Sequence, residues 1–179
     1  MMKKRKIILI TLMLMAMSLP ATVVAASPRL AVLDFELNDM TQLPRVPAEL
    51  ARVATLGPLV REAITNLGRV EVVPVPAEAY AKAKRGLEGY LFQHPEEAAT
   101  MGKDLGVDWV AITELYKTSF LYAYLHVILV HVPSGLVAGE TSISPRGLYR
   151  EGTERAAQRM AETIDLWITH KTALSATGP

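Results

Sequence analysis

Residues 108–144 read DWVAITELYKTSFLYAYLHVILVHVPSGLVAGETSIS, and this stretch decides the fold class. It contains three runs rich in β-branched and aromatic residues, at 108–116, 120–132 and 136–144. Pro133 to Gly135 supply a turn between the second and third runs. Short strands that follow one another with turns between them pair as an antiparallel meander. The sequence therefore predicts three consecutive antiparallel strands in the second half of the chain.

The first half of the chain alternates short apolar runs with helical patterns. Residues 29–35 and 70–74 are typical of buried strands, and residues 48–67 between them have apolar positions at near-helical spacing. Gly57-Pro58 interrupts this helical pattern, so the helix is either kinked there or restarts. Residues 36–47 are predicted to be a loop because they are rich in Asn, Asp and Pro. Further helices are expected over residues 77–85, 96–105 and 149–170.

This order of elements predicts an α/β fold with a single mixed sheet of about five strands and flanking helices. The strand–helix–strand units of the first half require parallel crossovers, whereas the meander adds antiparallel strands at one side. No internal repeat or long linker divides the chain. We therefore expect one domain over residues 27–171, followed by a flexible polar tail over residues 172–179.

The amino terminus is typical of a cleavable secretory signal. Lys3 to Lys6 are all basic, residues 7–17 are apolar except for one Thr, and small residues lead to Ala26. This is the three-part plan of an export signal, with cleavage expected after Ala25 or Ala26. A permanent membrane anchor is the alternative, but polar residues and a proline at 18–22 interrupt the run before the roughly 20 apolar residues that a span needs. Residues 1–26 are thus predicted to be removed, which places the protein in the periplasm or outside the cell with no stable membrane anchor.

Removal of the signal changes the charge of the chain. Four of the 19 Lys and Arg residues lie within residues 1–26, whereas all 18 acidic residues lie beyond them, so the remainder has 15 basic and 18 acidic residues and a net charge of −3. A net acidic chain without a basic stripe argues against nucleic acid as a partner. The chain has no cysteine, which excludes a lipid-anchored cysteine, a disulfide framework and Cys-ligated zinc.

Three stretches carry a resemblance to a known family. They are RLAVLDFEL at 29–37, DLGVDWVAITELYKTS at 104–119 and HVPSGLVAGETSISPRG at 131–147. Together they resemble a family of secreted bacterial proteins of unknown function and, more distantly, the TolB amino-terminal domain and its relatives in envelope assembly proteins. The resemblance implies an α/β fold and a location in the envelope, and it implies no reaction. Where the family pattern has Asn and Asp after an Arg-Gly pair, this chain has Leu148 and Tyr149.

Asp34, Glu36 and Asp39 cluster at the end of the first predicted strand and form one candidate ligand-binding site. Ligands of open α/β sheets favour the carboxyl ends of strands, and hard cations favour carboxylate oxygens. The alternative is that Asp34 only satisfies backbone donors in the following loop. The pattern lacks the repeated Asp spacing of a calcium loop, so the cluster remains a candidate without an assigned ion.

The strand predicted at 120–132 offers a candidate interaction surface. Leu125, Val127 and Leu129 alternate with residues of the opposite face, and they are expected to pack under helices. The opposite face carries aromatic residues and a histidine, and it is either a second buried layer or an open surface for a partner. Residues after the hairpin are placed to rim this surface. The candidate set is Tyr122, Tyr124, His126, Arg146, Tyr149 and Arg150.

No catalytic constellation is visible in the sequence. There is no Gly-x-Ser-x-Gly elbow, no Ser-x-x-Lys pair and no phosphate loop. His126 and His131 lie at an odd separation in one strand, so they face opposite sides and cannot share a metal. We therefore predict no metal, no cofactor and no enzymatic activity, and favour an accessory or protein-interaction module whose partner is an envelope or periplasmic protein. The alternative is a small-ligand or cation-binding protein, or a minor enzyme, with its site at the end of the first strand.

Overall fold

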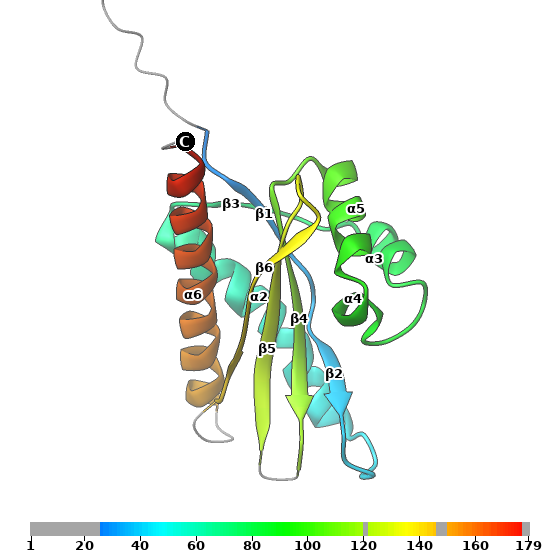
Figure 1. The fold of residues 1–179 in the computed structure, drawn as a ribbon. Coiled ribbons are helices and arrows are strands. Elements are labelled where there is room, and N and C mark those ends of the chain that lie inside the picture. The colour runs from blue at the N-terminus through cyan, green and yellow to red at the C-terminus, as the bar shows by residue number, and fades with distance from the viewer. Residues whose placement is uncertain (1–25, 120–121, 146–149, 177–179) are drawn as a thin grey trace, which may run out of the picture.

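A computed structural model describes residues 26–119, 122–145 and 150–176, and it shows one mixed sheet with helices on both faces (Figure 1). The strand order is β3-β1-β4-β5-β6, with β2 added beside β4. The β1, β2 and β3 strands run parallel to their neighbours, and β4, β5 and β6 form an antiparallel meander. The predicted fold class is therefore confirmed, with six strands in place of about five. The strands are β1 (Arg29–Val32), β2 (Glu36–Asp39), β3 (Glu71–Val73), β4 (Trp109–Lys117), β5 (Ala123–His131) and β6 (Leu136–Ile143).

The first predicted strand is divided into two. The chain leaves the ladder after Val32 and rejoins the same neighbour, β4, at Glu36, so the prediction of a loop over residues 36–47 is wrong for 36–39. Across the break, the Thr113 hydroxyl donates a hydrogen bond of 2.9 Å to the carbonyl oxygen of Leu33. A side chain of β4 thus satisfies a buried backbone group that a continuous ladder would have paired.

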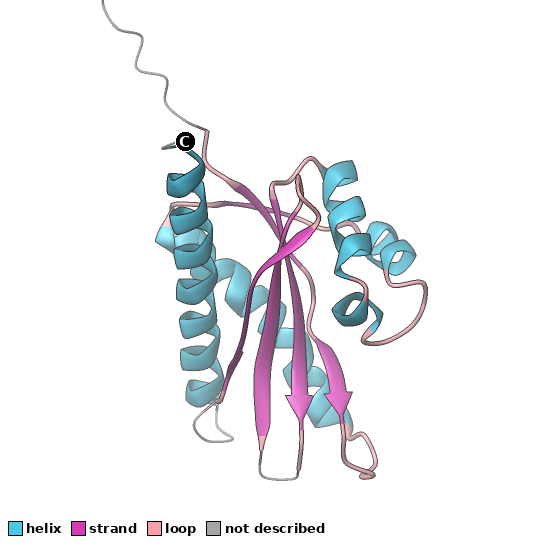
Figure 2. Ribbon diagram, in the orientation of Figure 1, coloured by secondary structure: helices cyan, strands magenta, loops and turns pink. Residues whose placement is uncertain are grey.

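Two helical layers cover the sheet. The α2 and α6 helices pack on one face, and α3, α4 and α5 lie on the other (Figure 2). The α2 helix runs through Gly57-Pro58 without restarting, and α6 continues to Ala176, beyond the end predicted near residue 170. None of the helices within the described residues is both long and apolar enough to cross a membrane. The helices are α2 (Pro47–Leu67), α3 (Ala77–Ala83), α4 (Tyr90–Gln93), α5 (Pro95–Leu105) and α6 (Arg150–Ala176).

The two faces of β5 are covered to different extents. Leu125, Val127 and Leu129 are buried under α2 and α6, as the alternation predicts. On the other face, Ile128 and Val130 are buried beneath the α3–α5 layer. The lower parts of β2, β4 and β5 extend past these three helices (Figure 1). The second face is therefore a buried layer at one end and an open surface at the other.

Candidate functional site

Glu36, the first residue of β2, is held by three donors from the helical layer above it. The Tyr80 hydroxyl donates to its carboxylate at 2.7 Å, the Lys84 ammonium lies 3.3 Å away, and the backbone N–H of Gly89 donates at 2.5 Å. Burial raises the pKa of the Tyr80 hydroxyl, and the hydrogen bond to Glu36 raises it further. Tyr80 therefore remains a neutral donor, and the Glu36 side chain is anchored by the three contacts.

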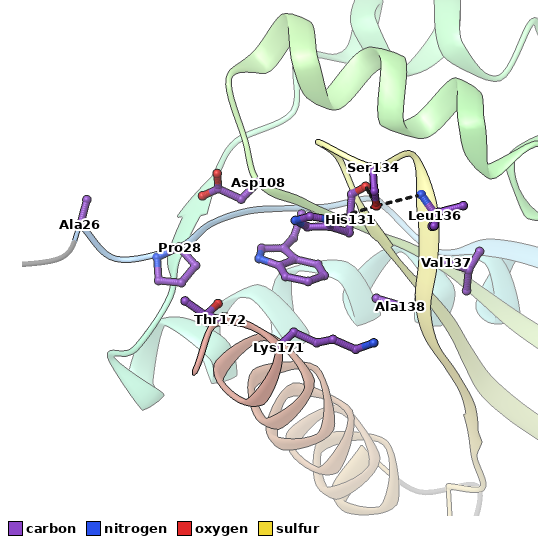
Figure 3. A pocket seen from close by; sticks show the side chains of 11 residues that line it. Ala26, Pro28, Asp108, His131, Ser134, Leu136, Val137, Ala138, Lys171 and Thr172 are labelled. Carbon is purple, nitrogen blue, oxygen red and sulfur yellow. Dashed lines mark hydrogen bonds between the residues drawn. The ribbon is translucent and has the colours of Figure 1, made fainter. Parts of the chain in front are cut away.

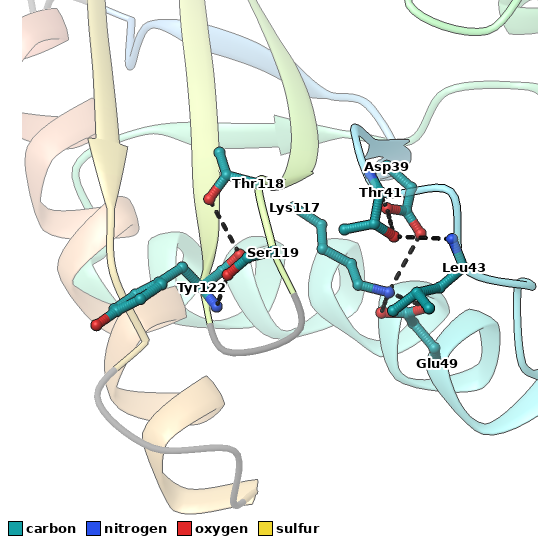
Figure 4. Close-up of polar contacts among 8 residues, drawn as sticks. All are labelled: Asp39, Thr41, Leu43, Glu49, Lys117, Thr118, Ser119 and Tyr122. Atoms are coloured by element: carbon teal, nitrogen blue, oxygen red, sulfur yellow. Dashed lines mark hydrogen bonds and ion pairs between the residues drawn. The ribbon is translucent and has the colours of Figure 1, made fainter.

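Asp39, the last residue of β2, points to the opposite face of the sheet. Its carboxylate accepts hydrogen bonds from the Thr41 hydroxyl at 2.6 Å and the Thr41 N–H at 2.8 Å. The Lys117 ammonium lies between Asp39, at 3.2 Å, and Glu49 of α2, at 2.9 Å (Figure 4). The Thr41 hydroxyl lowers the pKa of Asp39, and the hydrogen bond to Glu49 raises the pKa of Lys117. This ion network fastens the end of β2 to β4 and α2.

Asp34 lies apart from the other two predicted carboxylates. It follows β1 and forms an ion pair of 2.9 Å with the Arg61 guanidinium of α2. It lines a cavity between α2 and α3, whereas Glu36 and Asp39 line a different cleft. The predicted site at the end of the first strand is thus divided, because Asp34 lies in the break between β1 and β2, where the chain leaves the β4 ladder, whereas Glu36 and Asp39 belong to β2.

A polar cleft of about 510 Å³ lies where the α3–α5 layer ends and the open part of the sheet begins. It brings together Glu36 and Asp39 of one predicted site and His126 of the other. Five acidic residues and one arginine contribute to its lining, and the cleft is acidic even without the Asp39 carboxylate, which is turned to Lys117 on the other face. These charged residues are Glu36, Asp39, Arg45, Glu88, Glu114 and Glu140.

His126 lies between two carboxylates from neighbouring strands. Its Nδ1 is 3.1 Å from Glu114 of β4, and its Nε2 is 2.9 Å from Glu140 of β6. The Glu114 side chain is only 5% exposed and also accepts a hydrogen bond of 3.1 Å from the Asn38 amide. Only the protonated imidazole can donate from both nitrogens at once. In that form His126 links three adjacent strands across the floor of the cleft.

Glu114 and Glu140 were not among the residues predicted from the sequence, although both line the cleft. A signal for Glu114 was present, because it is a charged residue in an otherwise apolar run that was expected to be a buried strand. A buried carboxylate requires partners, and here both partners come from other strands. Their identity depends on strand register, which pairs Glu114 directly with His126.

Of the remaining residues of the predicted interaction surface, the structure describes the side chains of two and not those of the other three. Tyr122 is 60% exposed, and Tyr124 is half-buried in β5 beyond His126. Arg146 and Tyr149 lie outside the described residues. Arg150 begins α6, and its side chain is outside the description as well. Tyr124 and His126 therefore share one face of β5, Tyr122 lies just before this strand, and the contribution of the three residues after the hairpin stays a prediction.

The two strand histidines face opposite sides of the sheet, as predicted. His126 packs beside the Phe92 ring at 5.1 Å between centroids, and His131 packs beside Trp109 at 4.6 Å. Phe92 and Trp109 belong to the two different apolar layers. Within the described residues, no group of three or more His, Asp or Glu side chains is arranged to hold a metal ion.

A further cavity, of about 450 Å³, lies at the other end of the sheet (Figure 3). It is lined by Ala26 and Pro28, by the turn after β5 and by the end of α6. Two of its polar side chains bond to the protein itself. His131 Nδ1 is 2.9 Å from the Ser134 hydroxyl, and the Asp108 carboxylate accepts the Arg29 N–H at 2.8 Å. None of the predicted site residues lines this cavity.

Together, the sheet and the cleft define a small α/β domain with an acidic, internally bonded surface at the open end of a mixed sheet. The chain belongs to a family described as protein of unknown function (DUF2380), whose model matches residues 28–164. No curated protein matches the chain.

Several solved structures are similar in part. The carboxyl-terminal domain of LpoB from Salmonella enterica is 18% identical over 69% of this chain and 86% of that chain, with a TM-score of 0.46. TolB from Acinetobacter baumannii is 13% identical over 81% of this chain but 29% of that chain, with a TM-score of 0.48. A hypothetical protein from Chlamydia trachomatis is 12% identical over 80% of this chain and 96% of that chain, with a TM-score of 0.49.

Proposed function

We propose that the chain is exported, loses residues 1–26 and acts in the periplasm as a non-enzymatic interaction module of the cell envelope. Its partner is a protein that docks a basic segment on the acidic cleft and the adjoining open face of β5. The export pattern of the amino terminus and the resemblance of the sequence to secreted proteins support the compartment. No enzymatic step is assigned.

The observation that carries the docking proposal is the incomplete cover of the sheet. The α3–α5 layer ends near Phe92 and His126, and the sheet continues beyond it with Tyr124 half-buried in β5 and Tyr122, just before this strand, 60% exposed. Tyrosines with an apolar ring and a polar tip are enriched where proteins meet. A strand that presents Tyr124 beside a cleft, with Tyr122 at its start, is a suitable platform for a protein partner.

The charge of the cleft favours a basic partner. The four carboxylates that face the cleft, those of Glu36, Glu88, Glu114 and Glu140, outnumber the Arg45 guanidinium and the His126 imidazole. Glu140 is 58% exposed, and Glu88 is 59% exposed although it pairs with Arg45. Complementary charge steers association and disfavours partners of the same sign.

The acidic surface is also held in place before a partner arrives. Glu36 is fixed by Tyr80, Lys84 and the Gly89 N–H, and Glu114 is fixed by Asn38 and His126. Groups that are already ordered lose little further side-chain entropy on binding. The same internal contacts disfavour the cation-binding alternative, because the predicted carboxylates already have partners within the protein.

Photo-crosslinking in a Gram-negative host tests this proposal. A photoreactive residue is placed at Tyr122 or Tyr124, and the control position is Leu166, which is 60% exposed on α6. We expect a crosslinked envelope protein from the two tyrosine positions and none from Leu166. Glu140→Lys should reduce the crosslink, whereas Glu62→Lys on α2 should leave it unchanged. Sequencing of the mature amino terminus should begin at Ala26 or Ser27.

Three results would contradict the proposal. They are an intact amino terminus, equal crosslinking from α6, and crosslinking that does not respond to charge reversal at Glu140. The first would contradict the proposed periplasmic location. The other two would contradict the proposal that the partner docks on the cleft face. The mature chain of each variant must retain the wild-type circular dichroism spectrum for the comparison to hold.

A further inference from the structure

The cavity that Asp34 lines lies at the carboxyl ends of β1 and β3, and its lining differs in charge from that of the acidic cleft. These two parallel strands are neighbours in the sheet. The chain passes from β1 through β2 to α2 on one face, and it leaves β3 for α3 on the other, since the two helices contribute to different apolar layers. Connections that diverge in this way open a crevice at the strand ends, which is where ligands of α/β sheets bind.

The crevice has a volume of about 410 Å³, within the range of small-molecule sites. Its walls are mainly apolar and come from the strand ends and from α3. They include Val32, Val72, Val75 and Ala81. A ligand with a short apolar body therefore has surface to cover at this position.

The polar groups of this cavity favour an anion. Arg61 Nη1 donates to the carbonyl oxygen of Val32 at 3.0 Å and contacts Asp34 at 2.9 Å, which fixes the plane of the guanidinium. Its Nη2 and Nε make no hydrogen bond to the residues that the structure describes. The Lys84 ammonium lines the same cavity, 3.3 Å from Glu36 and 5.1 Å from the centroid of the Tyr80 ring. Both cations are partly buried, with side chains 29% and 27% exposed.

The role of Asp34 follows from these contacts. Among the described residues, its carboxylate is the only one that lines this cavity, and it accepts from one edge of Arg61. Gly57 of α2 lies against it, since a Cβ at that position would be 2.7 Å from the Asp34 oxygen. Asp34 thus positions the guanidinium and leaves the other edge of Arg61 for a planar oxyanion, which an arginine fork binds well.

We propose that this cavity binds a small organic oxyanion, a carboxylate or phosphate monoester with a short apolar group. The oxyanion lies on Arg61 with Lys84 nearby, and the apolar group lies along Val72, Val75 and Ala81. This site goes beyond the proposed interaction function and does not depend on it. It also reverses the chemistry that the acidic residues at this strand end suggest, because the ligand is an anion rather than a cation.

Nuclear magnetic resonance titration of the mature chain tests the proposal with three probes that share a six-carbon chain and differ in their polar group: hexanoate, hexyl phosphate and 1-hexanol. We expect saturable shifts at Val72, Val75 and Tyr80 with at least one of the two anions and none with the alcohol. The anion that binds more tightly distinguishes a carboxylate site from a phosphate site.

Matched variants connect the shifts to the cavity. Arg61→Gln should weaken anion binding about tenfold, the effect of losing a hydrogen bond to a charged group, while Arg52→Gln on the same helix should not. Ala81→Phe fills the cavity from an exposed helix position and should abolish binding without removing a charge.

The control for the filled cavity is Lys82→Phe, which is exposed on the same helix and does not line the cavity. Absence of saturable shifts with both anions would overturn the proposal, as would equal binding by the alcohol. Retention of binding in Ala81→Phe would do the same, and because that variant keeps Arg61 in place, the test does not depend on whether Arg61→Gln folds.

Discussion

Replacement of His126 by phenylalanine should destabilise the protein mainly through one buried contact. The new ring keeps the packing beside Phe92, whose centroid lies 5.1 Å from that of the imidazole. It removes the bonds to Glu114 at 3.1 Å and to Glu140 at 2.9 Å. Glu114 then keeps only the Asn38 amide as a partner, with its side chain 5% exposed.

The two lost contacts differ in their expected contribution. A hydrogen bond to a buried charged group contributes about 1.5–3 kcal/mol. The bond to Glu140 joins a 58% exposed carboxylate and contributes about 0–1 kcal/mol because water screens it. We therefore expect His126→Phe to lower the free energy of unfolding by about 2–3 kcal/mol, and Glu140→Gln by less than about 1 kcal/mol.

Urea denaturation of the mature chain, followed by circular dichroism at neutral pH, measures both effects. With a slope of about 1–3 kcal/mol per molar urea, His126→Phe should shift the midpoint by roughly 1–2 M. The double variant Glu114→Gln with His126→Phe should cost less than the sum of the single changes, since both remove one contact. An unchanged midpoint for His126→Phe, or an equal loss in Glu140→Gln, would refute the reasoning.

Two further perturbations probe other parts of the fold. Gly139→Ala should displace the Trp167 ring, because a Cβ at residue 139 would lie 2.7 Å from it, and overpacking of this kind costs about 1–3 kcal/mol. The near-ultraviolet circular dichroism band of tryptophan should change in Gly139→Ala and not in Ser142→Ala, and an unaltered band would contradict the contact. The fold lowers the pKa of Asp39, first through the Thr41 hydroxyl, so this group stabilises the protein above the ordinary aspartate range, and that stability is lost as pH falls through the lowered pKa. Asp39→Asn should therefore show a shallower fall of the urea midpoint in acid than the wild type, and coincident pH profiles would rule the effect out.

Several elements follow from local sequence alone. The meander of β4, β5 and β6 is encoded by alternating apolar runs and by the turn at residues 133–135, and the structure places those strands within a few residues of the prediction. Gly68 ends α2 with a φ of 70°, in the left-handed conformation that glycine adopts without strain. Periodicity and turn chemistry act over a few residues, so they can be read without knowledge of the fold.

The candidate site could be predicted only in pieces. Glu36 and His126 stand out as polar residues near or within apolar runs, yet they are 90 positions apart in sequence, and only the sheet brings them to one cleft. The partners of Glu114 depend on the register of β4 against β5 and β2. A register is fixed by the packing of whole faces, so no local pattern specifies which histidine meets which carboxylate.

The sequence by itself determined the class of fold, the antiparallel meander of its second half and the aliphatic face of β5 that carries the core. Only the tertiary structure decided that β1 and β2 are separate strands, that Asp34 lies apart from Glu36, and that the second face of β5 is half covered. The physical reason is the range of the forces involved. Backbone preference and hydrophobic periodicity are local, whereas ion pairs, the ends of helical layers and cavities arise between segments that folding alone makes neighbours.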